Sequence, residues 1–196
     1  MYNIGVKYEK EANLMKKTAI LFASGYEEVE ALTVVDLLRR AKIGCDIISV
    51  IGSDRVTGSH GICVGADRIF SETDFSQYDG VILPGGMPGT TNLAADERVL
   101  ALLRSFAAAG KLTAAICAAP TVLAKAGLLE GKKAVCYPGM EEQLTGAKVS
   151  FDPVAVDGTV ITSRGLGTAI PFALAIVQCF EGQGRAEALA SDVVFR

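Results

Sequence analysis

Short apolar runs alternate along this chain with longer segments of helical periodicity. The apolar runs predict strands over 18–24, 45–52, 78–86, 112–117 and, more briefly, 133–139. The helical patterns cover 27–42, 91–109, 118–129, 167–182 and 184–194. Strands that alternate with helices indicate a doubly wound α/β fold, in which helices cover both faces of a mostly parallel sheet.

Two local patterns add detail to this fold. Residues 153–163 predict a small β-hairpin, because Asp157 and Gly158 form a pair that favours a type I′ turn. The apolar residues of the first helix fall on one stripe, which is expected to face the sheet: Val29, Leu32, Val35 and Leu38.

The length of 196 residues suits one domain with a sizeable core, and no repeat or low-complexity linker divides the chain. The stretch MKKTAILFAS, which begins at Met15, is typical of a natural chain start that runs straight into a strand. Residues 1–14 are therefore interpreted as an N-terminal extension, and residues 15–196 as a single domain.

Composition narrows the choice of partners and compartment. The net charge of −3 and the lack of a basic run argue against nucleic acid and anionic membranes. No apolar run approaches the roughly 18 to 20 residues of a membrane-spanning helix, and the N-terminal residues lack the apolar core of a signal peptide. Five cysteines without a C-x-x-C pair, and a single histidine, argue against a disulfide framework and a metal site. We expect a cytoplasmic protein without a cofactor.

The chemistry is expected at one edge of the sheet, because doubly wound folds bind ligands beyond the carboxyl ends of their strands. Three unusual loops follow strands at that edge. In chain order they carry the glutamates Glu27, Glu28 and Glu30, the glycines Gly85 and Gly86, and Cys117. If these strands are neighbours, the three loops converge.

Cys117 lies where an apolar strand turns into a helical pattern, and its neighbours are small. Small neighbours permit a sharp turn that lifts a nucleophile out of the sheet. At the start of a helix, the dipole and free N–H groups would favour the thiolate and lower the pKa of the thiol. A buried core cysteine is the alternative, but the position at the junction favours a nucleophile.

Glu30 differs from the other two glutamates of its helical turn. Carboxylates in a first turn commonly complement the helix dipole, and this suffices for most of them. Glu30, however, lies beside the apolar stripe, from where it could point inward under the sheet edge. A buried carboxyl group there would have a raised pKa and could donate a hydrogen bond to a thiolate.

Gly85 and Gly86 end a predicted strand, and the first explanation for them is a turn that needs positive φ. Their N–H groups could also form an anion-binding nest that faces Cys117, like an oxyanion hole. His60 could act as a base, but a lone histidine in the Gly/Ser-rich stretch TGSHGI is commonly solvated. Cys136 is a core candidate that could lie near the same edge.

Four stretches together resemble the ThiJ/PfpI superfamily: SGYEEVEALTVVDLLRRA, YDGVILPGG, AAICAAP and TSRGLGTAIPFALAIV. The similarity is greatest to the subfamily of the parkinsonism-associated protein deglycase, and it covers nearly everything from Met15 onward. The resemblance implies a flavodoxin-like fold and a homodimer. It also implies that Cys117 is the reactive cysteine, that Glu30 hydrogen-bonds its sulfur, and that Gly86 and Ala118 are backbone donors near the thiolate.

Members of this family are described as glutathione-independent glyoxalases that act on methylglyoxal, as deglycases, and as redox sensors or chaperones. The resemblance therefore implies a cysteine-dependent enzyme that acts on small reactive dicarbonyls, in defence against carbonyl and oxidative stress. The alternative is a redox-sensing or chaperone-like homodimer, whose cysteine oxidises to the sulfinic acid with little catalysis. The same residues serve both functions.

The chain departs from the family pattern around this site. Tyr137 replaces a histidine that several members place near the cysteine, and Ala118 stands where the protease-like branch has a histidine. A Cys–His pair is therefore missing, which argues against peptidase chemistry. His60 replaces a common arginine, on a loop that could reach the site of a neighbouring subunit, and Leu166 replaces a common proline. The candidate pocket residues are His60, Cys136, Tyr137 and Leu166.

Overall fold

A computed structural model describes residues 16–196 of the chain, so the predicted extension, residues 1–14, lies outside the described residues. The strands are β1 (Lys17–Phe22), β2 (Gly44–Ser49), β3 (Arg55–Thr57), β4 (Cys63–Gly65), β5 (Arg68–Ile69), β6 (Gly80–Leu83), β7 (Leu112–Ile116), β8 (Lys133–Ala134), β9 (Lys148–Val149), β10 (Val154–Asp157) and β11 (Val160–Ser163). The main sheet has the order β10-β11-β7-β6-β1-β2-β5, while β3-β4 and β8-β9 form two small sheets.

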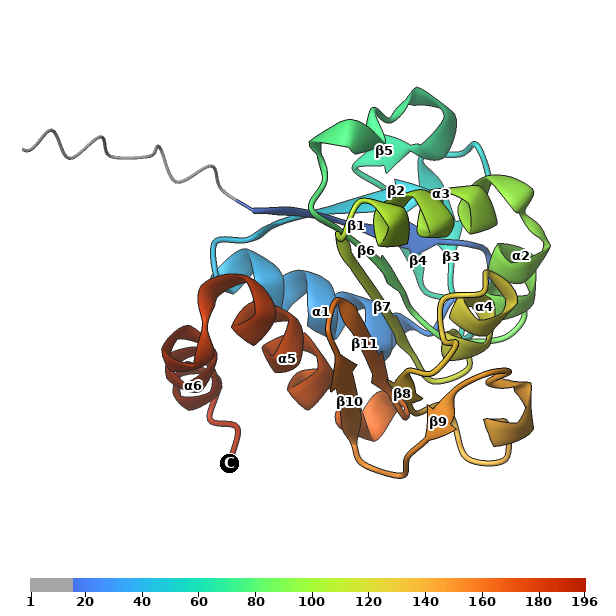
Figure 1. Cartoon of the computed structure of the whole chain (residues 1–196). Coiled ribbons are helices and arrows are strands. Elements are labelled where there is room, and N and C mark those ends of the chain that lie inside the picture. Colours follow the sequence, from blue (N-terminus) through green and yellow to red (C-terminus); the bar gives the residue numbers. More distant parts are fainter. Residues whose placement is uncertain (1–15) are drawn as a thin grey trace, which may run out of the picture.

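The helices are α1 (Glu28–Arg40), α2 (Gly89–Ala95), α3 (Glu97–Ala108), α4 (Pro120–Lys125), α5 (Ala169–Glu181) and α6 (Gln183–Asp192). α1, α5 and α6 lie on one side of the main sheet, and α2, α3 and α4 lie on the other (Figure 1). Every residue of β6 and β7 is buried, which explains why central strands are continuous apolar runs in the sequence. Within the described part of the chain, no helix is long and apolar enough to cross a membrane.

Apart from β5, a two-residue strand that pairs parallel with β2 at the edge, the parallel strands of the main sheet follow the order β2-β1-β6-β7-β11. Numbered along the chain, this is the order 2-1-3-4-5 of the flavodoxin-like fold, which confirms the predicted fold class. Strand order reverses between β1 and β6, and this switch point is where such folds bind ligands. The carboxyl ends of β1, β6 and β7 therefore border the candidate site.

The predicted hairpin is confirmed, but its turn type is wrong. β10 pairs antiparallel with β11, and Asp157 is opposite Val160, so the loop consists of Gly158 and Thr159. Only Gly158 has a positive φ, of 64°. A type I′ turn needs positive φ at both loop residues, whereas glycine at the first loop position is the type II′ pattern.

The helical pattern predicted over 91–109 corresponds to two helices, α2 and α3, and not to one continuous helix. Asp96 separates them with an extended backbone (φ −89°, ψ 106°). Its side chain accepts a hydrogen bond from the Arg98 N–H (2.9 Å), as the N-cap of α3. An aspartate before a helical segment is a capping signal, which the continuous apolar periodicity concealed.

The apolar stripe predicted for α1 is wrong at its start. Val29 is 48% exposed and Leu32 is half-buried, whereas the later stripe residues are buried. Glu30, Val34 and Leu38 instead form a buried row along the helix, at intervals of four residues. A carboxyl group thus occupies a core-facing position that apolar periodicity alone assigns to an aliphatic side chain.

The strands β3, β4 and β5 were not predicted, because two or three residues are too few to show an alternating pattern.

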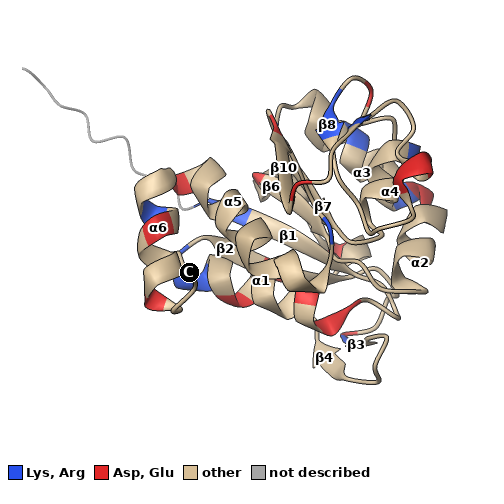
Figure 2. Ribbon diagram, turned by 90° about the horizontal axis from the view of Figure 1, so that it is seen from below, with Lys and Arg blue, Asp and Glu red and all other residues tan. Residues whose placement is uncertain are grey.

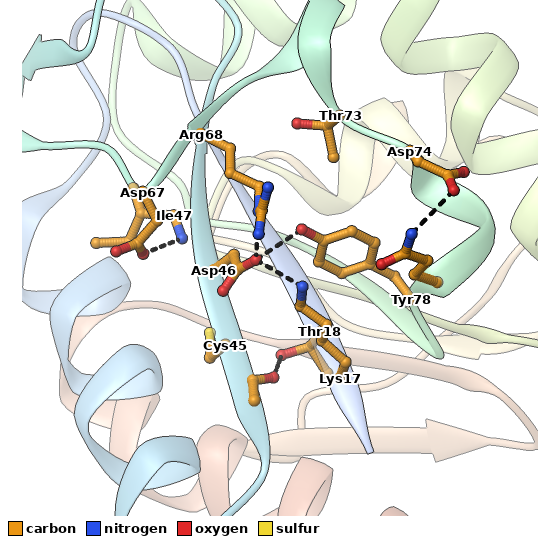
Figure 3. Close-up of polar contacts among 12 residues, drawn as sticks. Lys17, Thr18, Cys45, Asp46, Ile47, Asp67, Arg68, Thr73, Asp74 and Tyr78 are labelled. Carbon is orange, nitrogen blue, oxygen red and sulfur yellow. Dashed lines mark hydrogen bonds and ion pairs between the residues drawn. The ribbon is translucent and has the colours of Figure 1, made fainter. Parts of the chain in front are cut away.

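A polar cluster ties the edge strand β5 to the rest of the main sheet (Figure 3). In it, Asp46 Oδ2 accepts from Lys17 Nζ (2.9 Å), Arg68 Nε (3.0 Å) and the Tyr78 hydroxyl (2.7 Å). Burial opposes ionisation of Asp46, but these donors lower its pKa below the usual value. One carboxylate on β2 therefore joins β1, β5 and the segment before β6.

Candidate active site

Cys117 directly follows β7 and has a φ of 65°. This left-handed conformation costs a residue with a side chain about 1–2 kcal/mol. Hydrogen bonds hold it on both sides: the Cys117 N–H donates to the Ser163 carbonyl (2.9 Å), and the Cys117 carbonyl accepts from the Tyr137 N–H (2.7 Å). The sharp turn places a half-buried thiol at the carboxyl edge of the sheet.

Glu30 lies in the first turn of α1 and is 1% exposed. Its own N–H donates to Oε2 of Glu27, the N-cap residue of α1 (2.6 Å). Its carboxyl group is hydrogen-bonded to the Cys117 thiol, and its Oε2 accepts from the Gly85 N–H (3.0 Å). The Glu30 side chain therefore points inward, under the edge of the sheet, which is the orientation that the sequence allowed.

Gly85 makes room for this pair. A Cβ atom on Gly85 would lie 2.5 Å from Cys117 Cβ and 2.6 Å from Glu30 Oε2. The prediction that its N–H helps to bind an anion at the cysteine is wrong, because that N–H donates to Glu30 instead. Gly85 is therefore a spacer and a partner of the carboxyl group.

Two backbone N–H groups, from Gly86 and Ala118, hydrogen-bond to the Cys117 sulfur. Gly86 has a φ of 92°. A Cβ atom there would lie 2.6 Å from the carbonyl carbon of Tyr26, so this loop requires glycine. Converging N–H donors stabilise negative charge on the atom that they contact.

Glu30 and Cys117 titrate together, because the two groups are in contact and the charge of Glu30 opposes ionisation of the thiol. Burial raises the pKa of Glu30 to about 7. Burial, and then an ionised Glu30, raise the pKa of the Cys117 thiol to about 12, although the two N–H donors act in the opposite direction. The predicted lowering of the thiol pKa is therefore wrong; α4 has only six residues, and a carboxylate lies beside the sulfur. Between the two pKa values, the pair holds one proton.

A cavity of about 380 Å³ lies over Cys117. Its lining consists of Gly86, Met87, Cys117, Ala118, Tyr137, Pro138 and Met140. Met87, Pro138 and Met140 were not predicted; the available signal was their position directly beside predicted residues, Gly86 and Tyr137. A larger hollow of about 470 Å³, between α1 and the C-terminal residues, contains neither cysteine nor histidine.

Of the four predicted pocket residues, only Tyr137 lines this cavity. His60 lies on the loop between β3 and β4, is largely exposed, and has its Nδ1 2.9 Å from Glu28 Oε2. Cys136 is buried in the core on the α2–α4 side, whereas Cys117 packs against the core on the α1–α5 side. Leu166 is exposed outside the cavity. Cys136 and Leu166 therefore do not line the cavity as predicted, and within one chain His60 does not either; its reach to the site of a neighbouring subunit stays a prediction.

Glu28 is a second buried glutamate, and it fastens the β3–β4 hairpin to α1. Its carboxylate accepts from the backbone N–H groups of His60 (2.7 Å) and Ile62 (3.4 Å), from the Ser59 hydroxyl (3.3 Å) and from the His60 ring. Burial opposes its ionisation, but these hydrogen bonds lower the pKa of Glu28 to about 2. Figure 2 shows acidic residues at this end of α1, beside the hairpin.

One cluster among residues 16–196 has the spacing of a metal site. Glu27, Glu28 and His60 each offer a ligand atom, and these atoms lie within 4.8 Å of one another. Each group already has a protein partner, since Glu27 caps α1 and Glu28 pairs with His60. The docking of the hairpin accounts for this cluster, and we assign it no metal.

The fold and the site together define a class: flavodoxin-like proteins with a strained cysteine at the switch point, beside a buried glutamate. Comparison with known proteins agrees, because a model of the DJ-1/PfpI family matches residues 16–179. The chain therefore belongs to the DJ-1/PfpI family.

Three relatives illustrate the similarity. Protein dj-1beta of Drosophila melanogaster is 37% identical over 183 residues, 92% of this chain and 98% of the fly protein. Its crystal structure has a TM-score of 0.89 and covers 93% of this chain and 100% of the fly chain. Protein DJ-1 homolog B of Arabidopsis thaliana is 40% identical over 162 residues, which are 82% of this chain but 37% of the plant protein. A deglycase of Pyrococcus horikoshii is 30% identical over 151 residues, 76% of this chain and 89% of the deglycase.

Proposed function

We propose that the protein is a cysteine-dependent enzyme that converts small 2-oxoaldehydes, such as methylglyoxal, to 2-hydroxy acids without glutathione. The observation that carries this proposal is the pair of Cys117 and Glu30. It combines a strained thiol, open to a cavity, with a buried carboxyl group hydrogen-bonded to the sulfur. The Pyrococcus relative, named a deglycase, supports chemistry of this kind.

The reaction begins with the single proton that the pair holds near neutral pH. In the reacting form this proton moves from the thiol to Glu30, because two N–H groups contact the sulfur and stabilise the negative charge that develops there. The thiolate adds to the aldehyde carbon, C1, and a carbon–sulfur bond forms. The π electrons of the carbonyl group move to its oxygen atom, which becomes an alkoxide. The alkoxide takes the Glu30 proton, and the product is a hemithioacetal.

Glu30, now a carboxylate, removes the proton from C1 and returns it to C2 through an enediolate intermediate. The hydroxyl proton on the C1 oxygen moves to the C2 oxygen, so that C1 is oxidised and C2 is reduced by the same electron pair. The N–H groups of Gly86 and Ala118 hold the developing oxyanion. The product is a thioester on Cys117, and one water molecule hydrolyses it to the 2-hydroxy acid and the free thiol. No external oxidant or reductant is needed.

The first experiment mixes the purified protein with methylglyoxal, without glutathione, and follows lactate. We expect Cys117→Ser and Glu30→Gln each to reduce turnover by about 100-fold or more. Cys63→Ser is the matched control, because Cys63 is exposed and outside the cavity. Near wild-type turnover in either site variant would refute the mechanism.

A second candidate function is redox sensing. The contacts that hold a thiolate would also hold a sulfinate, because Glu30 and two N–H groups surround the sulfur. A sensor would bind client proteins after peroxide treatment, would lose this binding in Cys117→Ser, and would show negligible turnover. Cys136 is not expected to act as a resolving thiol, because it is buried on the other side of the sheet. Mass spectrometry of the oxidised protein should therefore show no Cys117–Cys136 link.

We also propose a homodimer, which Val29 and Ile62 support. Both are large exposed apolar side chains, and the hydrogen bond from the Ile62 N–H to Glu28, the residue before Val29, joins the two segments that carry them. Sedimentation should give twice the chain mass of 20.5 kDa for the wild type and a monomer for Val29→Lys. Val156→Lys, exposed on the edge strand β10, is the control that should remain dimeric. A monomeric wild type would refute the proposal.

A further inference from the structure

We propose that the cavity over Cys117 selects 2-oxoaldehydes with a branched aliphatic or aromatic substituent, over methylglyoxal and over hydroxylated dicarbonyls. This inference rests on the proposed function, because it assigns the substituent of the substrate converted there. It follows from the walls of the cavity, whose larger side chains are Met87, Tyr137, Pro138 and Met140.

The size of the cavity is the first argument. Cavities of roughly 300 to 1,000 Å³ accommodate drug-sized ligands, and this one measures about 380 Å³. Methylglyoxal has only three carbon atoms and would leave most of this space to water. A substituent with several more carbon atoms would fill it and displace that water from apolar surface.

The position of the reacting sulfur is the second argument. Because C1 of the substrate becomes bonded to the Cys117 sulfur, the substituent on C2 extends away from the sulfur and toward the other lining residues of the cavity. There, Met87 is 58% exposed and Tyr137 is 51% exposed, so both have apolar surface to bury against a ligand. Methionine side chains are flexible and adapt to irregular apolar shapes, while the tyrosine offers a flat ring.

The lack of charge on the walls is the third argument. None of the seven lining residues carries a charged side chain. Glu30 is buried and already hydrogen-bonded, and the Arg164 guanidinium lies outside the lining, where it donates to the Phe151 carbonyl (3.3 Å) and lies 5.8 Å from the Phe151 ring centroid. Among the lining side chains only the Tyr137 hydroxyl and the Cys117 thiol can hydrogen-bond, so a charged or hydroxylated substituent would lose water for few partners, which is unfavourable.

The test uses three 2-oxoaldehydes that share the reacting carbons: methylglyoxal, 4-methyl-2-oxopentanal and hydroxypyruvaldehyde. We expect kcat/KM for the isobutyl compound to exceed that for methylglyoxal by about tenfold or more. The hydroxymethyl compound should fall below methylglyoxal. Met140→Gln keeps the length of the side chain but adds an amide, and should lower the isobutyl-to-methyl ratio several-fold, mainly through KM. Met140→Leu, its apolar control, should keep the ratio.

A second measurement needs no turnover. Cys117 is alkylated with iodoacetamide and with its N-benzyl derivative, and both rates are divided by those of free glutathione. We expect the benzyl reagent to be favoured at Cys117 in the wild type and in Met140→Leu, and less so in Met140→Gln.

The outcomes separate the inference from the function on which it rests. Cys117-dependent turnover with the three kcat/KM values within threefold of one another overturns the inference and leaves the proposed function standing. Absence of turnover with every aldehyde overturns the proposed function. In that case the labelling ratio decides the selectivity of the cavity, and a ratio equal to that of glutathione refutes it.

Discussion

A hydrogen bond joins the Glu30 carboxyl group, in the first turn of α1, to the Cys117 thiol, in the turn after β7. Burial raises the pKa of both groups, and the charge of Glu30 raises that of the thiol further, whereas the hydrogen bond from the thiol lowers the pKa of Glu30. One proton is therefore shared by two groups from distant parts of the chain. Its position should govern both the stability of the fold and the reactivity of the thiol.

Glu30 should make the folded protein less stable as the pH rises. Its pKa is about 7 in the folded state against an ordinary value of 4.5. Its contribution to stability is therefore fully present below pH 4.5 and is lost as the pH rises through 7, by about 3 kcal/mol. Glu30→Gln should remove this component from the free energy of unfolding, measured in urea at a series of pH values. Equal pH dependence in both proteins would contradict the raised pKa.

Cys117 should become reactive toward alkylating agents near pH 7. Once Glu30 has lost its proton, with a pKa of about 7, it can accept the proton of the thiol, so the rate of iodoacetamide modification should rise with a midpoint near pH 7. Peptide mapping at each pH value measures this rate at Cys117 alone. A rate that rises only above roughly pH 8.5, the ordinary pKa of cysteine, would place the shared proton on sulfur instead.

Gly85→Ala should disturb the site more than its small size suggests. The new methyl group would meet Cys117 Cβ at 2.5 Å and Glu30 Oε2 at 2.6 Å. Overpacking of this kind costs about 2 kcal/mol, and the displaced carboxyl group should reduce turnover as well. Gly184→Ala is the matched control, because nothing lies within 4 Å of the added atom. Similar melting temperatures for the two variants would argue against the close approach at Gly85.

Asp46→Asn should destabilise the sheet edge. Three donors converge on one Asp46 oxygen (Figure 3), and the amide accepts less strongly than the carboxylate. Weakening these charge-assisted hydrogen bonds should lower the free energy of unfolding by about 1–2 kcal/mol. Asp36→Asn removes an exposed pair with Arg40 and should change stability by less than about 0.5 kcal/mol. A larger loss in the Asp36 variant would invert this prediction.

The central strands could be predicted because they are buried on both faces and so remain apolar throughout. The junction at Cys117 was visible for the same reason, since an apolar run changes there into a helical pattern. The split at Asp96 and the exposure of Val29 were missed, because periodicity averages over single residues and a capping side chain or a buried carboxyl group changes it locally.

The electrostatics of the site could not be predicted from local sequence. A helix start next to Cys117 suggested a lowered thiol pKa, yet α4 is short and the nearest charged group comes from α1. His60 and Glu28 likewise meet through the docking of a hairpin too short to be predicted. Such contacts depend on how helices, strands and loops that are distant in the sequence pack against one another. The spacing of residues along the chain does not predict this packing.

The backbone of Cys117 is held from two sides by Ser163 and Tyr137, and Glu30 is anchored by a helix cap and Gly85. Met87 and Met140, by contrast, lie in connecting segments outside any helix or strand. The reacting groups therefore belong to the framework, whereas most of the residues that meet a substituent belong to its loops. Mutation of those loops, by natural selection or in the laboratory, can change the range of molecules admitted while the reaction itself is inherited intact.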